Sequence, residues 1–252
     1  MDLKLKGQKA LITGGTKGIG RAIADLLAAE GCDVAICART AADVENAVKE
    51  LKAKGVRATG KGFDVGDGEA LKAWIASAAE ELGGLDILVS NVSGAGAPGE
   101  AGWKSNFEYD MMGAVRSVEA ALPFLSKSTN GNIVMISSTA ALEKFIQAGP
   151  YNALKAALIQ YSGALSQDLG AKGIRVNAVS PGPIFIEGGS WDRIKKNMTA
   201  FYDATVAQIP LGRMGTAHEV AAQVALLASP LGAFTTGTNV VIDGGLTKRI
   251  QF

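Results

Sequence analysis

The chain has 252 residues, with 25 Lys plus Arg against 24 Asp plus Glu, so its formal net charge is +1. This balance provides no general attraction to nucleic acid or to acidic membranes. A hydrophobic content of 48% excludes a disordered chain, and the length fits one α/β domain. The 32 glycines show no Gly-X-Y period, which indicates tight turns and places where a ligand approaches the backbone.

The chain has only two cysteines and one histidine, too few for a histidine-based metal centre or a disulfide framework. Cys32 and Cys37 lie in one apolar stretch, where small core residues are the usual interpretation. His218 is the only histidine and precedes a helical pattern, so we interpret it as an exposed first-turn residue. We therefore expect no metal centre, and acid–base chemistry near neutral pH must come from other side chains.

Neither a signal peptide nor a membrane span is expected. The first six residues contain no apolar h-region. The uncharged run 220–242 reaches membrane length, but it includes Pro230, two glycines and Asn239. A helix, a turn and a buried strand explain this run better than a bilayer span. The predicted location is the cytoplasm.

Strand-like apolar runs alternate with helix-like segments along the chain. In chain order, we expect a strand at 9–13, a helix at 18–29, a strand at 33–38, a helix at 41–54, a strand at 56–63, a helix at 69–82, a strand at 85–89, a helix at 103–126, a strand at 132–137, a helix at 150–170, a strand at 174–179, a helix at 216–228 and a strand at 239–242. This alternation predicts an α/β fold with a parallel sheet and helices on both faces. We place one domain over 1–252, with an irregular excursion at about 184–209 that is too long for a simple connection.

A glycine-rich loop joins the first strand to the first helix. It reads Thr-Gly-Gly-Thr-Lys-Gly-Ile-Gly over 13–20. Glycines permit a tight turn and close approach to a pyrophosphate, and the helix N-terminus offers free N–H groups to it. An ordinary turn needs one glycine rather than four, so we predict a nucleotide site. Its candidate residues are Gly14, Thr16, Lys17, Gly18, Ile19 and Gly20.

The end of the second strand favours NADP(H) over NAD(H). A carboxylate usually meets a free ribose diol at this position, whereas an arginine accommodates a 2′-phosphate. Arg39 follows the strand, no acidic residue ends it, and Lys17 lies in the glycine loop. The alternative for Arg39 is a solvated loop charge. Asp64, after the third strand, is a candidate acceptor for the adenine amino group; the alternative is a loop cap.

A tyrosine and a lysine open the helix after the fifth strand. Tyr151 and Lys155 are four residues apart and therefore share one helix face. A free tyrosine has a pKa of about 10, and an ammonium about 4 Å away stabilises the phenolate by about 4 kcal/mol at an effective dielectric of about 20. Ser138 follows the fifth strand, at the sheet edge where ligands bind. Its hydroxyl is a candidate hydrogen-bond donor to a substrate oxygen.

Together these motifs resemble the short-chain dehydrogenase/reductase family over essentially the whole chain, in particular its 3-oxoacyl-carrier-protein reductase-like members. The matching features are the glycine loop, Asp64, Ser138 thirteen residues before Tyr151, the Tyr-X-X-X-Lys motif, and Pro181-Gly182 with Ile184. The resemblance implies a doubly wound Rossmann fold with a seven-stranded sheet in the order 3-2-1-4-5-6-7. It also implies a homotetramer or homodimer.

The resemblance assigns a role to each catalytic position. Tyr151 is the acid/base, Lys155 binds the nicotinamide ribose and activates the tyrosine, and Ser138 orients the substrate oxygen. Hydride passes between the nicotinamide and a carbonyl or alcohol carbon. Further coenzyme contacts are implied at Val65, Asn91 and Ile184, besides those of Tyr151 and Lys155.

Three positions depart from the family pattern. Ser93 stands where the family usually has a glycine, and Ile186 where a threonine often contacts the carboxamide. Asp110 occupies the position of the fourth catalytic residue, an asparagine whose main-chain carbonyl is thought to hold a water of the proton relay. The carbonyl of Asp110 fits that role. Its carboxylate, close to Lys155, would stabilise the ammonium and partly cancel its effect on Tyr151.

The main functional hypothesis is an NADPH-dependent reductase of a small carbonyl compound, with no nucleic-acid or membrane partner. Two alternatives remain: an alcohol dehydrogenase working in the oxidative direction, and a weakly catalytic nucleotide-binding protein. In the excursion, a stripe at helical spacing packs in the core or lines a pocket for an apolar substrate: Trp191, Ile194, Met198, Phe201 and Thr205. Lys195 and Lys196 are either solvated charges or contacts for the phosphates of an acyl thioester.

Overall fold

The computed structural model describes residues 2–94, 97–145 and 148–249. Its principal elements, in chain order, are β1 (Lys9–Thr13), α1 (Gly18–Ala29), β2 (Asp33–Ala38), α2 (Ala41–Lys52), β3 (Ala58–Gly62), α3 (Gly68–Leu82), β4 (Ile87–Ser90), α4 (Gly99–Asn106), η1 (Phe107–Met112), α5 (Gly113–Leu125), β5 (Asn132–Ile136), α6 (Pro150–Gly170), β6 (Arg175–Pro181), β7 (Ile184–Phe185), α7 (Ser190–Asn197), α8 (Thr199–Ala207), β8 (Gly215–Thr216), α9 (Ala217–Ala228) and β9 (Asn239–Ile242). Short 3₁₀ turns follow β5 (η2, Thr139–Ala141) and α9 (η3, Pro230–Gly232).

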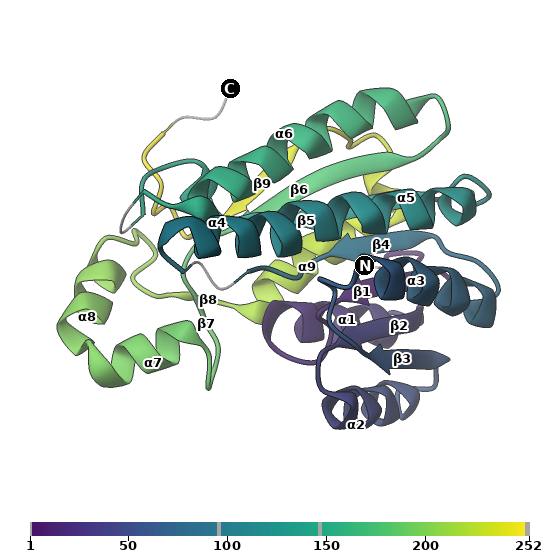
Figure 1. Cartoon of the computed structure of the whole chain (residues 1–252), viewed down its shortest axis with the longest axis horizontal. Helices are drawn as coiled ribbons and strands as arrows, with labels where there is room; N and C mark the ends of the chain where they lie inside the picture. The colour runs from purple at the N-terminus through teal and green to yellow at the C-terminus, as the bar shows by residue number, and fades with distance from the viewer. Residues whose placement is uncertain (1, 95–96, 146–147, 250–252) are drawn as a thin grey trace.

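Seven parallel strands form the main sheet in the order β3-β2-β1-β4-β5-β6-β9. This is the predicted order, with β9 as the seventh strand, and Figure 1 shows helices on both faces. A second sheet pairs β7 with β8. It was not predicted, because strands of two residues carry no periodicity. None of the helices among the described residues has the length and apolar character needed to cross a membrane.

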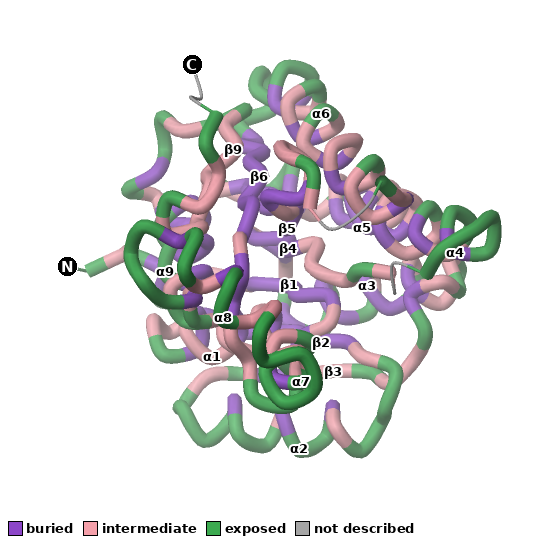
Figure 2. The backbone as a smooth tube through the Cα atoms, turned by 90° about the vertical axis from the view of Figure 1, so that its left-hand side faces the viewer, coloured by how far each residue is buried: buried purple, intermediate pink, exposed green. Residues whose placement is uncertain are grey.

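Two apolar layers cover the sheet. On one face, α1, α2 and α9 pack against strand residues such as Ile12 and Ile36. On the other, α3, α5 and α6 pack against Leu11, Leu88 and Met135. Neighbouring side chains of β1, Leu11 and Ile12, thus pack into opposite apolar layers, because successive side chains of a strand point to opposite faces. Figure 2 shows the buried strands at the centre. Both faces are covered, which explains why the strands read as continuous apolar runs.

Local sequence signals begin the helices at defined residues. The Asp67 side chain caps α3, Pro150 is the first residue of α6, and Thr216 and Glu219 form a reciprocal capping box at α9. These are standard N-terminal signals. They explain why the predicted starts of these helices lie within a residue of those observed.

One predicted helix and one predicted side-chain stripe are interrupted. The single helix expected at 103–126 is α4, a π-helical segment (η1) and α5, and the π-helical segment contains Asp110. In the excursion, a break at Met198, with φ −141°, separates α7 from α8 and leaves that side chain exposed. The predicted stripe was therefore wrong for Met198, because one helical periodicity does not continue across the break.

Candidate active site

The loop after β1 has the geometry of a phosphate site. Gly14 and Gly18 have φ values of +70° and +61°, which residues other than glycine rarely adopt. Lys17 is the N-cap of α1 and makes no side-chain cap hydrogen bond, so the first-turn N–H groups remain for a ligand. Asn91 donates from Nδ2 to the carbonyls of Thr13 (3.0 Å) and Gly14 (3.3 Å). Asn91, which directly follows β4, therefore fixes this loop.

The predicted loop residues differ in their surroundings. Gly20 is buried, and a Cβ at this position would lie 2.3 Å from the Gly14 carbonyl oxygen. Gly20 thus permits α1 to pack against its own loop. Ile19 packs against the apolar layer under α1, and a Cβ on Gly18 would lie 3.3 Å from Ile186 of the excursion.

A cavity of about 600 Å³ opens beside this loop. Its size is in the usual range for small-molecule and cofactor sites. Seven of the predicted coenzyme residues line it: Gly14, Thr16, Lys17, Arg39, Asp64, Val65 and Asn91. The cavity is also lined by Ser93, Gly94 and Tyr109. Ile184 lies elsewhere, buried in β7 and paired with Gly215 of β8.

The charges around this cavity differ in one respect from the sequence-based expectation. Arg39 is exposed on its wall. Lys17, however, forms an ion pair with Asp43 of α2, 2.7 Å from Nζ to Oδ2. No acidic residue ends β2, but the Asp43 carboxylate reaches the same region from the first turn of α2. Asp43 was missed because it lies four residues beyond Arg39, inside a helix.

Tyr109 is a second residue that sequence reasoning missed. Its hydroxyl donates to Asp64 Oδ2 at 2.9 Å, while Asp64 Oδ1 accepts the N–H of Gly66. The hydrogen bond to Asp64 raises the pKa of the Tyr109 phenol. Asp64 is therefore held by protein donors on both oxygens, and each oxygen keeps a lone pair for a further donor.

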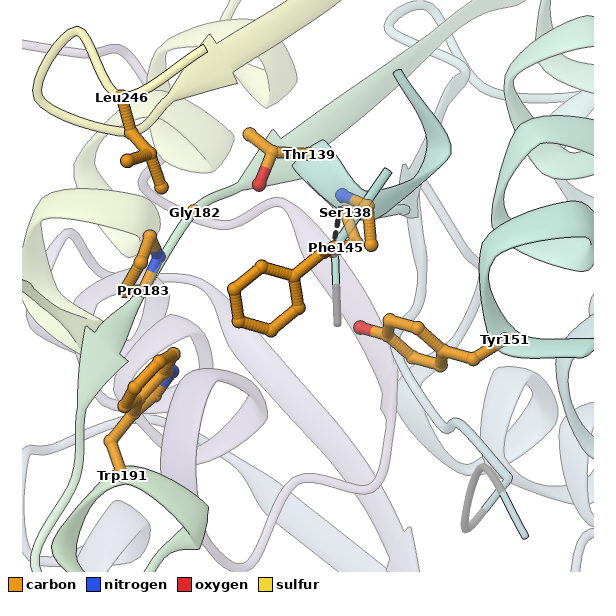
Figure 3. Close-up of a pocket in the computed structure, with 9 residues that line it drawn as sticks. Ser138, Thr139, Phe145, Tyr151, Gly182, Pro183, Trp191 and Leu246 are labelled. Atoms are coloured by element: carbon orange, nitrogen blue, oxygen red, sulfur yellow. Dashed lines mark hydrogen bonds between the residues drawn. The ribbon is translucent and has the colours of Figure 1, made fainter. Parts of the chain in front are cut away.

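A smaller cavity, of about 120 Å³, lies next to the predicted reactive groups. Figure 3 shows the Tyr151 hydroxyl pointing into it, with Ser138 on the same wall. The other lining residues are mainly apolar: Thr139, Ala140, Phe145, Gly182, Pro183, Trp191 and Leu246. Ser138 Oγ accepts the Ala140 N–H at 3.1 Å. Three hydroxyl-bearing residues and an aromatic wall thus line one small space.

Lys155 is buried behind Tyr151. Its Nζ lies 5.8 Å from the centre of the Tyr151 ring and donates to the carbonyl of Ile136 in β5 at 2.9 Å. It also lies 2.9 Å from Asp110 Oδ1. The exposed fractions of Lys155 and Asp110 are only 2% and 1%. The Asp110 carboxylate and the Lys155 ammonium therefore form a buried ion pair.

Comparison with known proteins agrees with this geometry. A family model described as enoyl-(acyl carrier protein) reductase matches residues 14–247. The isoepoxydon dehydrogenase of Penicillium expansum is 41% identical over 254 residues, covering 98% of each chain. The chain belongs to the short-chain dehydrogenase/reductase family. Its members catalyse oxidation and reduction at alcohol and carbonyl groups, and this chain is an oxidoreductase of that kind.

Two further members of the family illustrate the range of relatives. The putative ketoacyl reductase of the monensin polyketide synthase from Streptomyces virginiae is 36% identical, covering 94% of this chain and 96% of that protein. The L-sorbose reductase of Gluconobacter frateurii, solved with NADPH and L-sorbose, superposes with a TM-score of 0.91 at 29% identity, covering 99% and 100% of the two chains. The short-chain dehydrogenase/reductase fold thus extends over the whole chain.

Proposed function

We propose that this short-chain dehydrogenase/reductase uses NADPH to reduce a compact, largely apolar carbonyl compound to an alcohol. The observation that carries the proposal is the position of Tyr151 and Lys155 one turn apart on α6. Tyr151 faces the small cavity and Lys155 is buried behind it. NADPH bound in the larger cavity would supply the hydride.

Residues of the larger cavity fit a coenzyme with a 2′-phosphate. Arg39 and Lys17 line it together, and cations at this position accommodate that phosphate. The N-terminus of α1 and the positive-φ glycines fit the pyrophosphate. The L-sorbose reductase with the same fold was solved with NADPH, which supports the same preference here.

The chain's own groups act at the carbonyl oxygen. Tyr151 donates its hydroxyl proton to that oxygen, and Lys155 favours the resulting phenolate through its positive charge. Ser138 Oγ uses a lone pair to accept from Ala140, which leaves the Ser138 hydroxyl proton to hydrogen-bond the same oxygen. These roles are general acid catalysis by Tyr151 and orientation by Ser138.

The lining of the small cavity supports an uncharged, compact substrate. Phe145, Trp191 and Leu246 form apolar walls, and the Phe145 and Trp191 rings lie 6.0 Å apart. Trp191 is held from behind by a stacked contact with Phe201, 6.2 Å between ring centres. Such walls favour a flat or cyclic apolar body. We also propose that the segment from β7 to α8, which supplies Trp191, is the substrate lid.

Neither lysine of the lid supports a carrier-bound acyl thioester. Lys196 is paired with Asp192 at 2.8 Å, and the Lys195 ammonium lies 5.5 and 5.4 Å from the ring centres of Phe185 and Tyr202. Both cations thus interact within the lid itself. We therefore favour a free small molecule over an acyl thioester as the substrate.

A turnover screen tests this function. NADPH consumption is measured with small cyclic and aromatic ketones, with linear ketones, and with 3-oxoacyl thioesters, using Tyr151→Phe as the control. We expect turnover of the cyclic and aromatic ketones that the control lacks. Turnover confined to thioesters would contradict the substrate class. NADPH binding without turnover in either direction would favour the non-catalytic alternative.

Oxidation of an alcohol is the second candidate. The name of the 41% identical relative, isoepoxydon dehydrogenase, favours it. The same Tyr151 then accepts the alcohol proton instead of donating one. Comparing kcat/KM for the ketone with NADPH and for its alcohol with NADP⁺ near neutral pH decides between the two directions.

We also propose that the chain forms a homodimer or homotetramer. Several large apolar side chains are exposed, including Phe107, Leu231 and Phe234, and exposed apolar groups of this size are typical of interfaces when they cluster. Light scattering on the eluting protein would show a mass near two or four times 25.9 kDa. A mass of one chain at micromolar concentration would contradict the proposal.

A further inference from the structure

Three hydrogen-bond donors and one ammonium surround the carboxylate of Asp110. Oδ1 accepts from the Ser93 hydroxyl at 2.7 Å and forms an ion pair with the Lys155 ammonium, 2.9 Å away. Oδ2 accepts from the Gly94 N–H at 2.9 Å and from Asn106 Nδ2 at 2.8 Å. Each carboxylate oxygen thus has two close partners, and a carboxylate has about four acceptor sites in all.

An asparagine side chain at position 110 does not fit this arrangement as the carboxylate does. An asparagine at 110 would turn an NH₂ group toward either Lys155 or the Gly94 N–H, and both are donors. The asparagine that the family pattern places here is therefore poorly matched to this chain. Ser93, which also departs from that pattern, supplies one of these four partners. The two departures are parts of one hydrogen-bonded unit.

The unit determines where the Lys155 ammonium sits. An ammonium has three N–H donors. Within the described part of the chain, one of them is donated to Ile136 O, and Asp110 Oδ1 lies 2.9 Å from Nζ as the counter-ion, so N–H capacity remains for a ligand. An ammonium that is 2% exposed needs a close counter-charge, because burial of an unpaired charge is costly. The direction of the remaining N–H thus depends on the position of the Asp110 carboxylate.

We infer that Ser93 is a positioning residue for the reaction. Its hydroxyl holds Asp110 Oδ1, and Asp110 in turn holds the Lys155 ammonium directly, without an intervening water. Ser93 lies on the wall of the coenzyme cavity, whereas Asp110 is almost fully buried. Ser93 therefore anchors the exposed side of a buried ion pair. The inference rests on the proposed function, because the role of Lys155 in turnover belongs to it.

Three variants of Ser93 and Asp110 test the inference. Ser93→Ala removes the hydroxyl, and Ser93→Thr keeps it; the exposed position leaves room for the added methyl group. Asp110→Asn removes the carboxylate charge on which Ser93 acts. Ser77→Ala, on the exposed side of α3, is the matched control. Hydrogen bonds to charged groups have a measurable effect when removed.

Two independent readouts are compared. In turnover of the best carbonyl substrate, Ser93→Ala is expected to lower kcat about tenfold with KM for the carbonyl nearly unchanged. Ser93→Thr should restore most of kcat, and Ser77→Ala should match the parent. In urea unfolding of the coenzyme-free protein, Ser93→Ala should lower the midpoint in the parent but not in the Asp110→Asn background, because contacting residues are not additive.

Each other outcome has a distinct meaning. Equal kcat for Ser93→Ala and Ser77→Ala would overturn the inference, as would failure of Ser93→Thr to restore turnover. Additive midpoint shifts in the double variant would show that Ser93 does not act through Asp110, and would overturn it as well. A parent that binds NADPH and turns over no carbonyl or alcohol contradicts the proposed function instead, even where the unfolding data show the coupling.

Discussion

Lys17 Nζ lies 2.7 Å from Asp43 Oδ2 on the wall of the coenzyme cavity that Arg39 also lines. The Lys17 side chain is 78% exposed, so this is a surface ion pair of modest strength. Its consequence is nevertheless specific. Asp43 neutralises one of the two cations from which NADPH preference is inferred, and its own negative charge would repel a 2′-phosphate.

Replacement of Asp43 should strengthen NADPH binding. In Asp43→Asn, Lys17 is free to contact the coenzyme phosphate and a nearby negative charge is gone. We expect NADPH affinity to rise about threefold to tenfold, with NADH affinity nearly unchanged, since only NADPH carries the extra phosphate. Fluorescence titration at low and high salt measures both. An equal gain for the two coenzymes would place the 2′-phosphate away from Lys17.

Arg39→Asp should act in the opposite sense. The guanidinium is lost and a carboxylate appears where a ribose diol is usually bound. The ratio of NADPH to NADH affinity should fall by at least tenfold and is expected to reverse. Arg39→Gln is the control that removes the charge without adding a carboxylate, and it should give an intermediate ratio. A parent protein with equal affinity for the two coenzymes would remove the basis of this prediction.

Tyr151→Phe should abolish most turnover while leaving coenzyme binding intact. The ring remains beside Lys155, and only the proton-transfer group is removed. General acid catalysis usually accounts for a factor of 10² to 10⁴, so kcat should fall by at least that lower factor. NADPH affinity, measured by titration, should change less than twofold. Retention of more than about a tenth of the parent rate would exclude Tyr151 as the general acid.

Most helix starts were predictable because local signals determine them, whereas the strand order followed from the resemblance to the family. Pro150 begins α6, and the Thr216–Glu219 capping box begins α9. The apolar strands alternate with helices in a way that permits few topologies. The π-helical segment around Asp110 and the break at Met198 were not predictable, because tertiary contacts, rather than propensity, set them.

Candidate site residues were predictable where one motif carries them, as for Tyr151 and Lys155. Contacts between separate motifs were not. Asp43 reaches Lys17 from the next helix, Tyr109 reaches Asp64 across 45 residues, and the Ser93 hydroxyl reaches Asp110 across 17. Each of these depends on how a loop is placed over a helix. The periodicity of a sequence does not indicate which residues of separate motifs come into contact.

Both cysteines should be unreactive in the folded protein. Cys32 and Cys37 are fully buried, and burial raises the pKa of each thiol to about 12. At pH 8 only about one thiol in ten thousand is then the reactive thiolate. We expect almost no reaction with Ellman's reagent at pH 8 in the native state and two thiols per chain in urea. Rapid labelling of one thiol without urea would indicate local opening of β2 or the segment before it.

Removal of the Asp110 charge should affect both stability and the pH dependence of turnover. Asp110→Asn leaves the Lys155 ammonium buried without its counter-ion, a change that typically costs about 3–5 kcal/mol in the free energy of unfolding. Asp168→Asn, an exposed position on the same helix as Lys155, is the control and should change stability by less than about 0.5 kcal/mol.

The rate of the same variant tests the electrostatic influence of this contact. The negative charge of Asp110 offsets part of the positive charge of the buried Lys155 ammonium, 2.9 Å away. The pH profile of the alcohol-oxidation rate should therefore differ from that of the parent in Asp110→Asn and stay in place in Asp168→Asn. An unchanged profile, in a variant that remains folded, would show that the contact between Asp110 and Lys155 has no influence on proton transfer.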